Sequence, residues 1–369
     1  MSWQLVKLEE VCEINIGKTP SRSNLEYWKD GTDFWLSIAD MSVGENIIST
    51  KEKITKKAIN DSRIKLVNPN TILLSYKLSV GKVGISQYPL YTNEAIAALP
   101  IKNPKQLDTR YLLHVLKNVD FHKEADRAAK GLTLNKDKLK KIEIPLPSLT
   151  NQRLIAAILD KANEIEANRK LALTKLDKLA QSIFIDMFGD VIKNPKNLPV
   201  KQLKDILKLK SGDALTASSM KESGIYQVYG GNGVNGLHDN FMYEDKIIVI
   251  GRVGAYCGCV HITSEKCWVT DNALAVKILD SNINFEYLAF ALKEANLNQY
   301  SSQSGQPLIS GSRLYPINII TPSLLMQENF AKIKVAIDAQ KEVLSKSSNL
   351  FSLFLKSLHN QAFTTGFNA

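Results

Sequence analysis

The sequence predicts an α+β fold in which two globular mixed α/β domains are separated by two long helices. Three observations favour this fold. An amphipathic helical pattern at residues 151–188 returns 175 residues later at 326–363, with apolar residues three and four apart in both copies. The motif Pro-Ser-Leu-x-x-Gln opens both patterns, at Pro147 and at Pro322. The segment before each pattern shows the same order of apolar runs and glycine-rich turns.

The chain is therefore predicted to be a tandem repeat. Similar copies tend to pack with pseudo-twofold symmetry, and a twofold across the long helices makes them an antiparallel coiled coil. The predicted segments are two globular domains, at 1–148 and 191–322, and two long helices, at 149–190 and 323–365.

Composition indicates a globular protein with room for a sizeable core. The 369 residues are 44% hydrophobic and 23% charged, which suits two or three domains. No run of about 18 apolar residues occurs, and the first residues resemble no signal segment, so we expect a soluble cytoplasmic protein that does not enter a membrane. The four cysteines do not form a secreted disulfide framework.

The net charge of +10 lies mainly in the first half of the chain. Residues 1–149 contain 23 Lys and Arg against 17 Asp and Glu, whereas residues 201–322 contain 11 of each. A polyanionic partner fits this surplus, although a sequence pI near 9.2 is equally common among proteins that never bind nucleic acid.

The first globular segment alternates apolar runs with polar turns. Residues 3–11 read as a short strand or helix that leads into a turn at 14–20. Residues 71–75 form a buried-strand candidate before a glycine-rich turn at 79–84, and residues 111–117 are helical in pattern.

The second globular segment repeats these features in the same order. Residues 200–206 lead into the turn at 209–212, and residues 247–250 lead into the glycine-rich turn at 251–254. The helical pattern returns at 287–293. The two copies differ most in their loops, as expected if the loops carry the function.

The long helices have recognisable ends. Ser148 or Thr150 can cap the first of them, and Gly189 with Pro195 can end it. At 1.5 Å per residue, 38 residues make a rod of about 57 Å. The residues predicted to pair the helices are Ile158, Leu176, Leu179, Ile183, Ile333, Ile337, Phe351, Phe354 and Leu358. Such helices can also form an interdomain core that binds no partner.

Three short patterns resemble cofactor sites but have simpler interpretations. Gly17-Lys18-Thr19 resembles the end of a phosphate-binding loop, but Cys12 stands where that loop needs its first glycine. Residues 231–236 spell G-x-G-x-x-G, but no convincing helix follows, so a flexible glycine-rich loop is expected. Cys257, Cys259, His261 and Cys267 could supply zinc ligands, but a strand would spread the first three apart, and buried thiols are expected.

No arrangement of residues indicates catalysis. The five histidines form no metal-binding pair motif, and paired carboxylates such as Glu9 and Glu10 fit solvated faces. The short acidic-aromatic motifs of an adenine methyltransferase are missing from the sequence. We therefore expect no catalytic residue, no metal site and no cofactor on this chain.

The arrangement resembles the specificity (S) subunit of type I restriction-modification systems over essentially the whole chain. The similarity rests on the two halves, the two long helices, the repeated Pro-Ser-Leu-x-x-Gln, and five local strings. These strings are residues 3–20, 199–212, 229–233, 251–254 and 271–273.

The resemblance implies two target recognition domains, each reading one half of a split double-stranded DNA site. It further implies two modification (methyltransferase) subunits, carrying S-adenosylmethionine, that bind around the helices and methylate adenine. A restriction or translocase subunit can join such a complex. The uncharged second domain departs from this pattern, because phosphate binding favours a surplus of cations.

Cations and amides beside the turns are the candidate DNA contacts. Lysine and arginine can reach phosphates or guanine edges, and asparagine and glutamine can make two-point contacts with adenine. Tyr256 could stack on a base or fill space at the contact. The candidates in the first domain are Lys18, Arg22, Lys77, Lys82, Asn93 and Lys130. Those in the second domain are Lys210, Asn232, Asn235, Arg252, Tyr256, Asn272, Ser304, Gln306 and Arg313.

Two rival functions remain open at this point. One is a stand-alone nuclease or nucleotide-dependent enzyme, whose activity would depend on Lys18. The other is a coiled-coil adaptor that binds only protein, which would show no salt-dependent binding to DNA.

Overall fold

The computed structural model describes residues 3–42, 44–121, 126–128, 131–302 and 307–364. Tertiary contacts divide the chain into two units, residues 1–169 with 347–369 and residues 170–346. This division differs from the four consecutive segments expected, because each unit takes a part of both long helices.

The first unit is built around a five-stranded sheet in the order β2-β10-β6-β8-β4, which is antiparallel except where β4 pairs with β8. These strands are β2 (Asn15–Ile16), β10 (Ile96–Leu99), β6 (Ile72–Ser75), β8 (Val83–Ser86) and β4 (Asn46–Ile47). Three smaller sheets join it. One three-stranded sheet has the order β5 (Glu52–Ile54), β3 (Asp33–Leu36) and β9 (Tyr91–Thr92), and another has the order β11 (Asp126–Ala128), β12 (Gly131–Thr133) and β7 (Lys77–Leu78). The third is the pair of β1 (Leu5–Lys7) and β13 (Glu143–Pro145). The helices are α1 (Leu8–Val11), α2 (Lys56–Ser62), α3 (Thr109–Asn118), α5 (Lys136–Lys141), η1 (Leu25–Tyr27) and η2 (Asp40–Ser42).

The second unit repeats the same plan. Its four-stranded antiparallel sheet has the order β15-β21-β18-β19: β15 (Leu207–Ser211), β21 (Ala273–Ile278), β18 (Ile248–Gly251) and β19 (Val260–Ile262). Beside it lie β17 (Gly233–His238), β16 (Tyr226–Gly230) and β20 (Trp268–Val269), and the pair β14 (Val200–Gln202) and β22 (Asn318–Ile320). The helices are α7 (Leu203–Ile206), α8 (Phe285–Glu294), α9 (Gly311–Leu314), η3 (Ala217–Ser219), η4 (Gly254–Tyr256) and η5 (Leu297–Tyr300).

The strand pairings confirm the internal repeat. Each unit contains a parallel strand pair in a three-stranded sheet: β3 pairs with β9 in the first unit, and β16 pairs with β20 in the second. Both strand candidates before glycine-rich turns, at 71–75 and 247–250, form fully buried strands, β6 and β18. Both helical patterns form helices, α3 and α8, with six consecutive buried residues each. Helices and strands of this mixed kind give the predicted α+β class.

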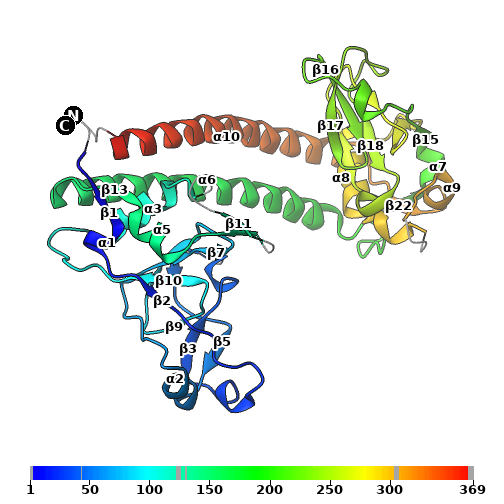
Figure 1. Cartoon of the computed structure of the whole chain (residues 1–369). Helices are drawn as coiled ribbons and strands as arrows, with labels where there is room; N and C mark the ends of the chain where they lie inside the picture. The colour runs from blue at the N-terminus through cyan, green and yellow to red at the C-terminus, as the bar shows by residue number, and fades with distance from the viewer. Residues whose placement is uncertain (1–2, 43, 122–125, 129–130, 303–306, 365–369) are drawn as a thin grey trace. The chain divides into compact units, whose positions relative to one another are not determined.

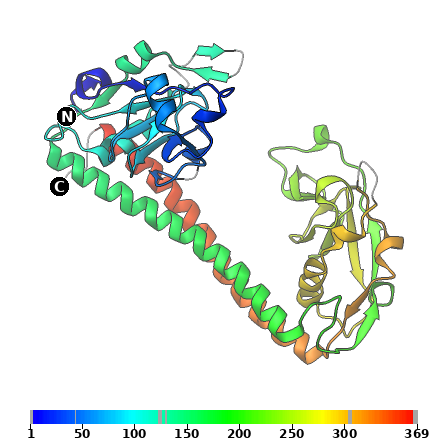
Figure 2. The same cartoon turned by 90° about the horizontal axis from the view of Figure 1, so that it is seen from below.

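The two long helices are continuous: α6 spans Leu149–Phe188 and α10 spans Leu324–Thr364. They run antiparallel where they meet in the first unit, since Arg169 Nη1 donates to Ser347 O (2.8 Å) and Ser352 Oγ donates to Glu166 Oε1 (3.1 Å). In the second unit Lys341 of α10 pairs with Asp177 of α6. Figure 2 shows the red end of α10 beside the first turns of α6.

The buried residues of the long helices lie mainly near their ends. Ile155, Leu159 and Ala162 are buried near the start of α6, and Ala180, Phe184 and Phe188 near its end. Between 163 and 179, and between 338 and 354, every residue is at least partly exposed. The helix ends are therefore packed against the globular domains, whereas the middle stretches are only half covered.

Part of the predicted pairing seam is wrong. Leu179, Ile333 and Phe354 are 47%, 39% and 55% exposed, so they do not lie in a buried seam. Ile337 is buried; Leu176 and Ile183 pack on the core of the second unit and Leu358 on that of the first, while Ile158 and Phe351 are partly buried. The physical reason is that a helix of 3.6 residues per turn drifts off a strict seam, and neighbouring positions such as Ala180 and Leu355 take the buried places.

Candidate nucleic-acid interface

Several turns of the second unit converge beside Arg252, which follows β18. The Arg252 backbone N–H donates to Asn272 O (2.9 Å), and its Nη1 donates to Ser211 Oγ (3.0 Å) and Asp271 O (3.4 Å). A Cβ on Gly251 would lie 2.2 Å from Tyr256 O, so only glycine permits this approach of two backbones. The structure thus brings together three of the predicted residues: Arg252, Tyr256 and Asn272.

The corresponding turns of the first unit converge beside Lys18. The Lys18 backbone N–H donates to Thr92 O (2.8 Å), and Asn93 N–H donates to Leu36 O (3.0 Å). A Cβ on Gly17 would lie 2.2 Å from Asn93 O, so this contact also requires glycine. Lys18 and Asn93 therefore lie together, with the exposed Lys18 Nζ donating to Ser62 O (3.2 Å).

Arg22 is held in a cluster of its own. Its guanidinium lies 3.8 Å from the centroid of the Trp28 ring and 4.9 Å from that of Trp35. It makes a two-point contact with the Glu52 carboxylate, with Nη2 donating to Oε2 (2.9 Å). The hydrogen bond from Arg22 lowers the pKa of Glu52, so this pair is ionised at neutral pH. Its charge is neutralised locally, which suits an ordered loop better than a phosphate contact.

The remaining candidates are more scattered. Lys82 Nζ donates to Ser42 Oγ (2.6 Å) and Ile38 O (3.3 Å), and Lys77 Nζ lies 5.3 Å from the centroid of the Tyr76 ring. Lys210 is exposed on β15, Asn232 and Asn235 are exposed on the β16–β17 hairpin, and Arg313 is exposed on α9. Lys130, Ser304 and Gln306 fall outside the described residues.

Sequence reasoning missed the tryptophans of both units. Trp35 is buried in the first unit and donates from Nε1 to Lys18 O (3.1 Å), which ties the Lys18 turn to the Arg22 cluster. Trp268 donates from Nε1 to Asp213 O (3.2 Å) and packs edge-on against His238 (ring centroids 5.3 Å apart). A tryptophan beside a polar turn was the available signal, but its partners are distant in sequence.

The three cofactor-like patterns fold as ordinary backbone. Residues 231–236 belong to the antiparallel β16–β17 hairpin, and β17 rather than a helix follows the turn. The expectation of a flexible loop there is therefore wrong. Gly17-Lys18-Thr19 follows β2 and leads to no helix before η1. Cys257 and Cys267 are buried, and burial raises the pKa of both thiols. Cys257 Sγ donates to Arg252 O (3.3 Å), so this thiol supports the arginine turn.

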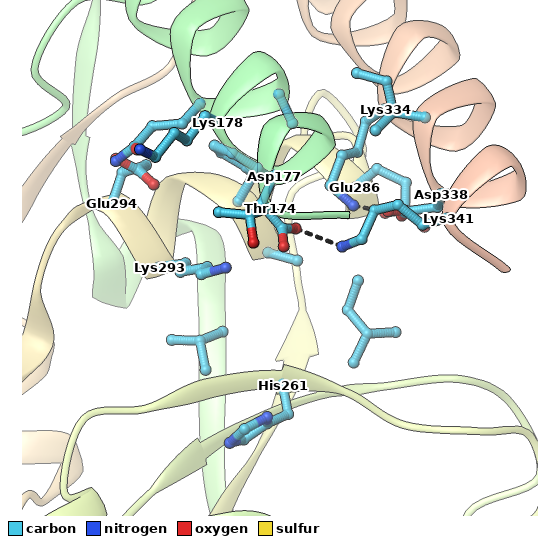
Figure 3. Close-up of a pocket in the computed structure, with 17 residues that line it drawn as sticks. Thr174, Asp177, Lys178, His261, Glu286, Lys293, Glu294, Lys334, Asp338 and Lys341 are labelled. Carbon is cyan, nitrogen blue, oxygen red and sulfur yellow. Dashed lines mark hydrogen bonds and ion pairs between the residues drawn. The ribbon is translucent and has the colours of Figure 1, made fainter. Parts of the chain in front are cut away.

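A cavity of about 470 Å³ in the second unit lies among α6, α8, α10 and β19 (Figure 3). Phe290 and Ile337 contribute apolar lining, and four lysines face four carboxylates. Lys341 pairs with Asp177, Lys334 pairs with Asp338, and burial raises the pKa of Glu286. Because these charges balance, the cavity lacks the cationic surplus that DNA phosphates require.

The first unit carries a buried histidine at the position equivalent to Phe290. His114 is 1% exposed, and its Nε2 lies 2.8 Å from Asp160 Oδ1. Its buried Nδ1 has no hydrogen-bond partner among the residues that the structure describes. Arg110 also pairs with Asp160, and the His359 ring lies 6.5 Å from that of His114. Burial lowers the pKa of His114, although the hydrogen bond to Asp160 opposes this shift.

Acidification from about pH 7 to about pH 5 is therefore expected to destabilise the first unit. The His114 imidazole has a pKa near 6.5 in the unfolded chain and a lower pKa in the folded chain. The folding stability that this residue contributes above pH 6.5 is therefore lost as the pH falls through the folded pKa. The change His114→Phe copies the second unit and should reduce this loss. Urea midpoints of both proteins at the two pH values measure it; equal pH dependence would contradict the assignment.

Two similar α/β domains, each packed on the long helices and each with polar turns that lie together, define a modular subunit with a duplicated candidate binding site. The type I restriction modification DNA specificity domain matches residues 1–175 and 195–350. The chain belongs to this family and is a sequence-specific DNA-binding specificity subunit of a type I restriction-modification complex.

Individual relatives agree with this assignment. The chain is 26% identical over 364 residues to the EcoprrI specificity subunit of Escherichia coli, covering 94% of this chain and 90% of the relative. It is 31% identical over 229 residues to the MjaIX specificity subunit of Methanocaldococcus jannaschii, covering 57% of this chain and 52% of the relative. The fold is similar to that of the type I S subunit from M. genitalium, with a TM-score of 0.65 at 17% identity over 98% of this chain and 96% of the other. No helix within the described residues is long and apolar enough to cross a bilayer.

Arg252 is the candidate contact with the most defined geometry, and its removal should weaken DNA binding. Arg252→Ala is expected to lower specific affinity by about 5-fold to 150-fold, the cost of one good base contact, and to relax base preference in one half of the site. Arg252→Lys should restore only non-specific binding, because lysine lacks the planar fork. Binding titrations on DNA variants measure both effects. Lys277→Ala, an exposed change on β21, is the control, and an equal loss in it would contradict a specific role for Arg252.

Proposed function

We propose that the chain reads a two-part DNA site with a gap, one part with each recognition domain. The observation that carries this proposal is the continuity of α6. Ile155 and Leu159 of this helix are buried in the core of the first unit, and Ala180, Phe184 and Phe188 in the core of the second. A helix of 40 residues rises about 60 Å, which corresponds to roughly 17 or 18 base-pair steps. On this basis the two recognition domains are proposed to read separate stretches of duplex.

Two modification subunits are the proposed protein partners, and they bind along the exposed apolar faces of the long helices. Seven large apolar residues on α10 are at least 39% exposed, and four on α6 are at least 46% exposed. Exposed apolar surface on this scale supports a protein interface. Those subunits would carry S-adenosylmethionine and methylate adenine in the cytoplasm, and a restriction subunit can join them. This chain would contribute recognition and no chemical step.

Sequence-selective binding at moderate salt tests this function. The chain with its modification subunits should prefer one DNA sequence, and its affinity should fall steeply with salt because phosphate contacts release counterions. Binding without preference for any sequence would contradict DNA recognition. Behaviour independent of salt and DNA would favour a protein-only adaptor, and metal- or ATP-dependent cleavage by the chain alone that is lost in Lys18→Ala would favour an enzyme.

A further inference from the structure

One polar side chain is completely buried at the start of each long helix. Gln152 lies in the first turn of α6 and Gln327 in the first turn of α10, and both are 0% exposed. They are the glutamines of the repeated Pro-Ser-Leu-x-x-Gln motif. A buried amide is costly unless it is hydrogen-bonded, so its partners reveal what the position does.

Both glutamines bind the same three backbone groups of their unit. Gln152 Oε1 accepts from Asp108 N–H (2.9 Å), and its Nε2 donates to Gln106 O and Pro147 O (both 2.8 Å). Gln327 Oε1 accepts from Asn284 N–H (2.9 Å), and its Nε2 donates to Asn282 O (3.1 Å) and Pro322 O (2.7 Å). Both amide hydrogens are used in each case. The side chain therefore joins the long helix to the loop before α3 or α8.

The same loop residue begins the short helix of the recognition domain. The Asp108 side chain caps α3 by accepting from Tyr111 N–H (3.0 Å), and Asn284 caps α8 by accepting from Tyr287 N–H (3.1 Å). The tyrosine hydroxyls then donate to the ends of β13 and β22, at Pro145 O and Ile320 O (both 2.9 Å).

The tyrosine rings also contact the end of the other long helix. Tyr111 lies edge-on to Phe363 of α10 (6.0 Å between centroids), and Tyr287 lies edge-on to Phe188 of α6 (5.0 Å). Each set of glutamine, cap and tyrosine, here called the clasp, thus joins one domain to both long helices. Figure 1 shows α3 and β13 next to α6 in the first unit.

We infer that Gln152 and Gln327 are positioning residues that fix the orientation of each recognition domain on the long helices and thereby the length of the gap in the DNA site. Apolar packing alone is non-directional, whereas three hydrogen bonds to one planar amide define an angle. Removing them leaves a buried N–H and two carbonyls unsatisfied, which favours small rotations that expose them. The inference rests on the proposed reading of a gapped site.

The test is methylation of a DNA library in which the two half-sites are separated by every gap length. The complex with the unaltered chain should methylate one gap length. Gln152→Met and Gln327→Met, singly and together, should also methylate gaps one base pair shorter or longer, lowering the preference for the original gap about tenfold, as expected for the loss of one or two net hydrogen bonds. The sequences of the half-sites should stay unchanged, a result that general loss of stability would not produce.

Leu159→Ala is the matched control, because Leu159 is fully buried in α6 but belongs to no clasp; it should lower stability and keep one gap length. Should the methionine variants fail to fold, Tyr111→Phe and Tyr287→Phe remove only the hydroxyl links and should broaden the gap in the same direction. Unchanged gap preference in folded clasp variants overturns the inference. Failure of the unaltered complex to methylate any gapped site contradicts the proposed function instead.

Discussion

Replacing Leu353 and Phe354 with aspartate is expected to abolish assembly with the modification subunits while leaving the chain folded. Leu350, Leu353 and Phe354 lie at spacings of three and four on α10, and they are 69%, 64% and 55% exposed. Since they are exposed in the chain alone, charging them costs little in its fold. Two carboxylates buried in an interface would cost several kcal/mol, which corresponds to a loss of affinity of more than about 100-fold.

Co-purification and size-exclusion chromatography of the complex measure this effect. Asn349→Asp introduces a charge at another exposed position of the same helix and should assemble normally. Assembly of the Leu353→Asp, Phe354→Asp double variant at wild-type affinity would show that this face of α10 contacts no partner. The measurement therefore tests whether the exposed apolar residues have a binding role.

Truncating Phe184 to alanine is expected to lower the unfolding free energy of the second unit by about 3–5 kcal/mol. Phe184 is 0% exposed, and its ring lies 5.0 Å from Phe188, 4.9 Å from Phe290 and 5.1 Å from Phe330 between centroids. This aromatic cluster packs the end of α6 against α8 and the start of α10. Its loss leaves a cavity that neighbouring rings can fill only in part.

Denaturant titration followed by circular dichroism checks this prediction. The neighbouring change Ile185→Ala is the control, because Ile185 is 50% exposed and its truncation should cost no more than about 0.5 kcal/mol. Equal shifts for the two variants would show that the aromatic cluster does not stabilise this unit.

The sequence alone supports the repeat because two kinds of signal coincide. Periodicity identifies α6 and α10, and an offset of 175 residues aligns Gln152 with Gln327. Local patterns of this kind also place β6, β18, α3 and α8 correctly, because the spacing of apolar residues along the sequence indicates which positions of a helix or strand are buried. The fold class, the antiparallel helices and the family all follow from this level.

The contacts that build the candidate interface could not be predicted in this way. Arg22 meets Glu52 and His114 meets Asp160 through tertiary packing, across 30 and 46 residues of sequence. Leu179 looks like a seam residue until the neighbouring Ala180 is found buried in its place. Convergence of the Lys18 turn with Asn93, or of Arg252 with Asn272, depends on strand order, which no local pattern encodes.

Mapping methylated adenines in the genome of a host with and without this chain tests the central claim most directly. The modification subunits are kept in both strains, so every site that disappears depends on recognition by this chain. We expect these sites to share two short sequences separated by a gap of fixed length and variable sequence. A contiguous motif, or methylation that does not change when the chain is removed, would contradict the reading of a two-part site by two recognition domains.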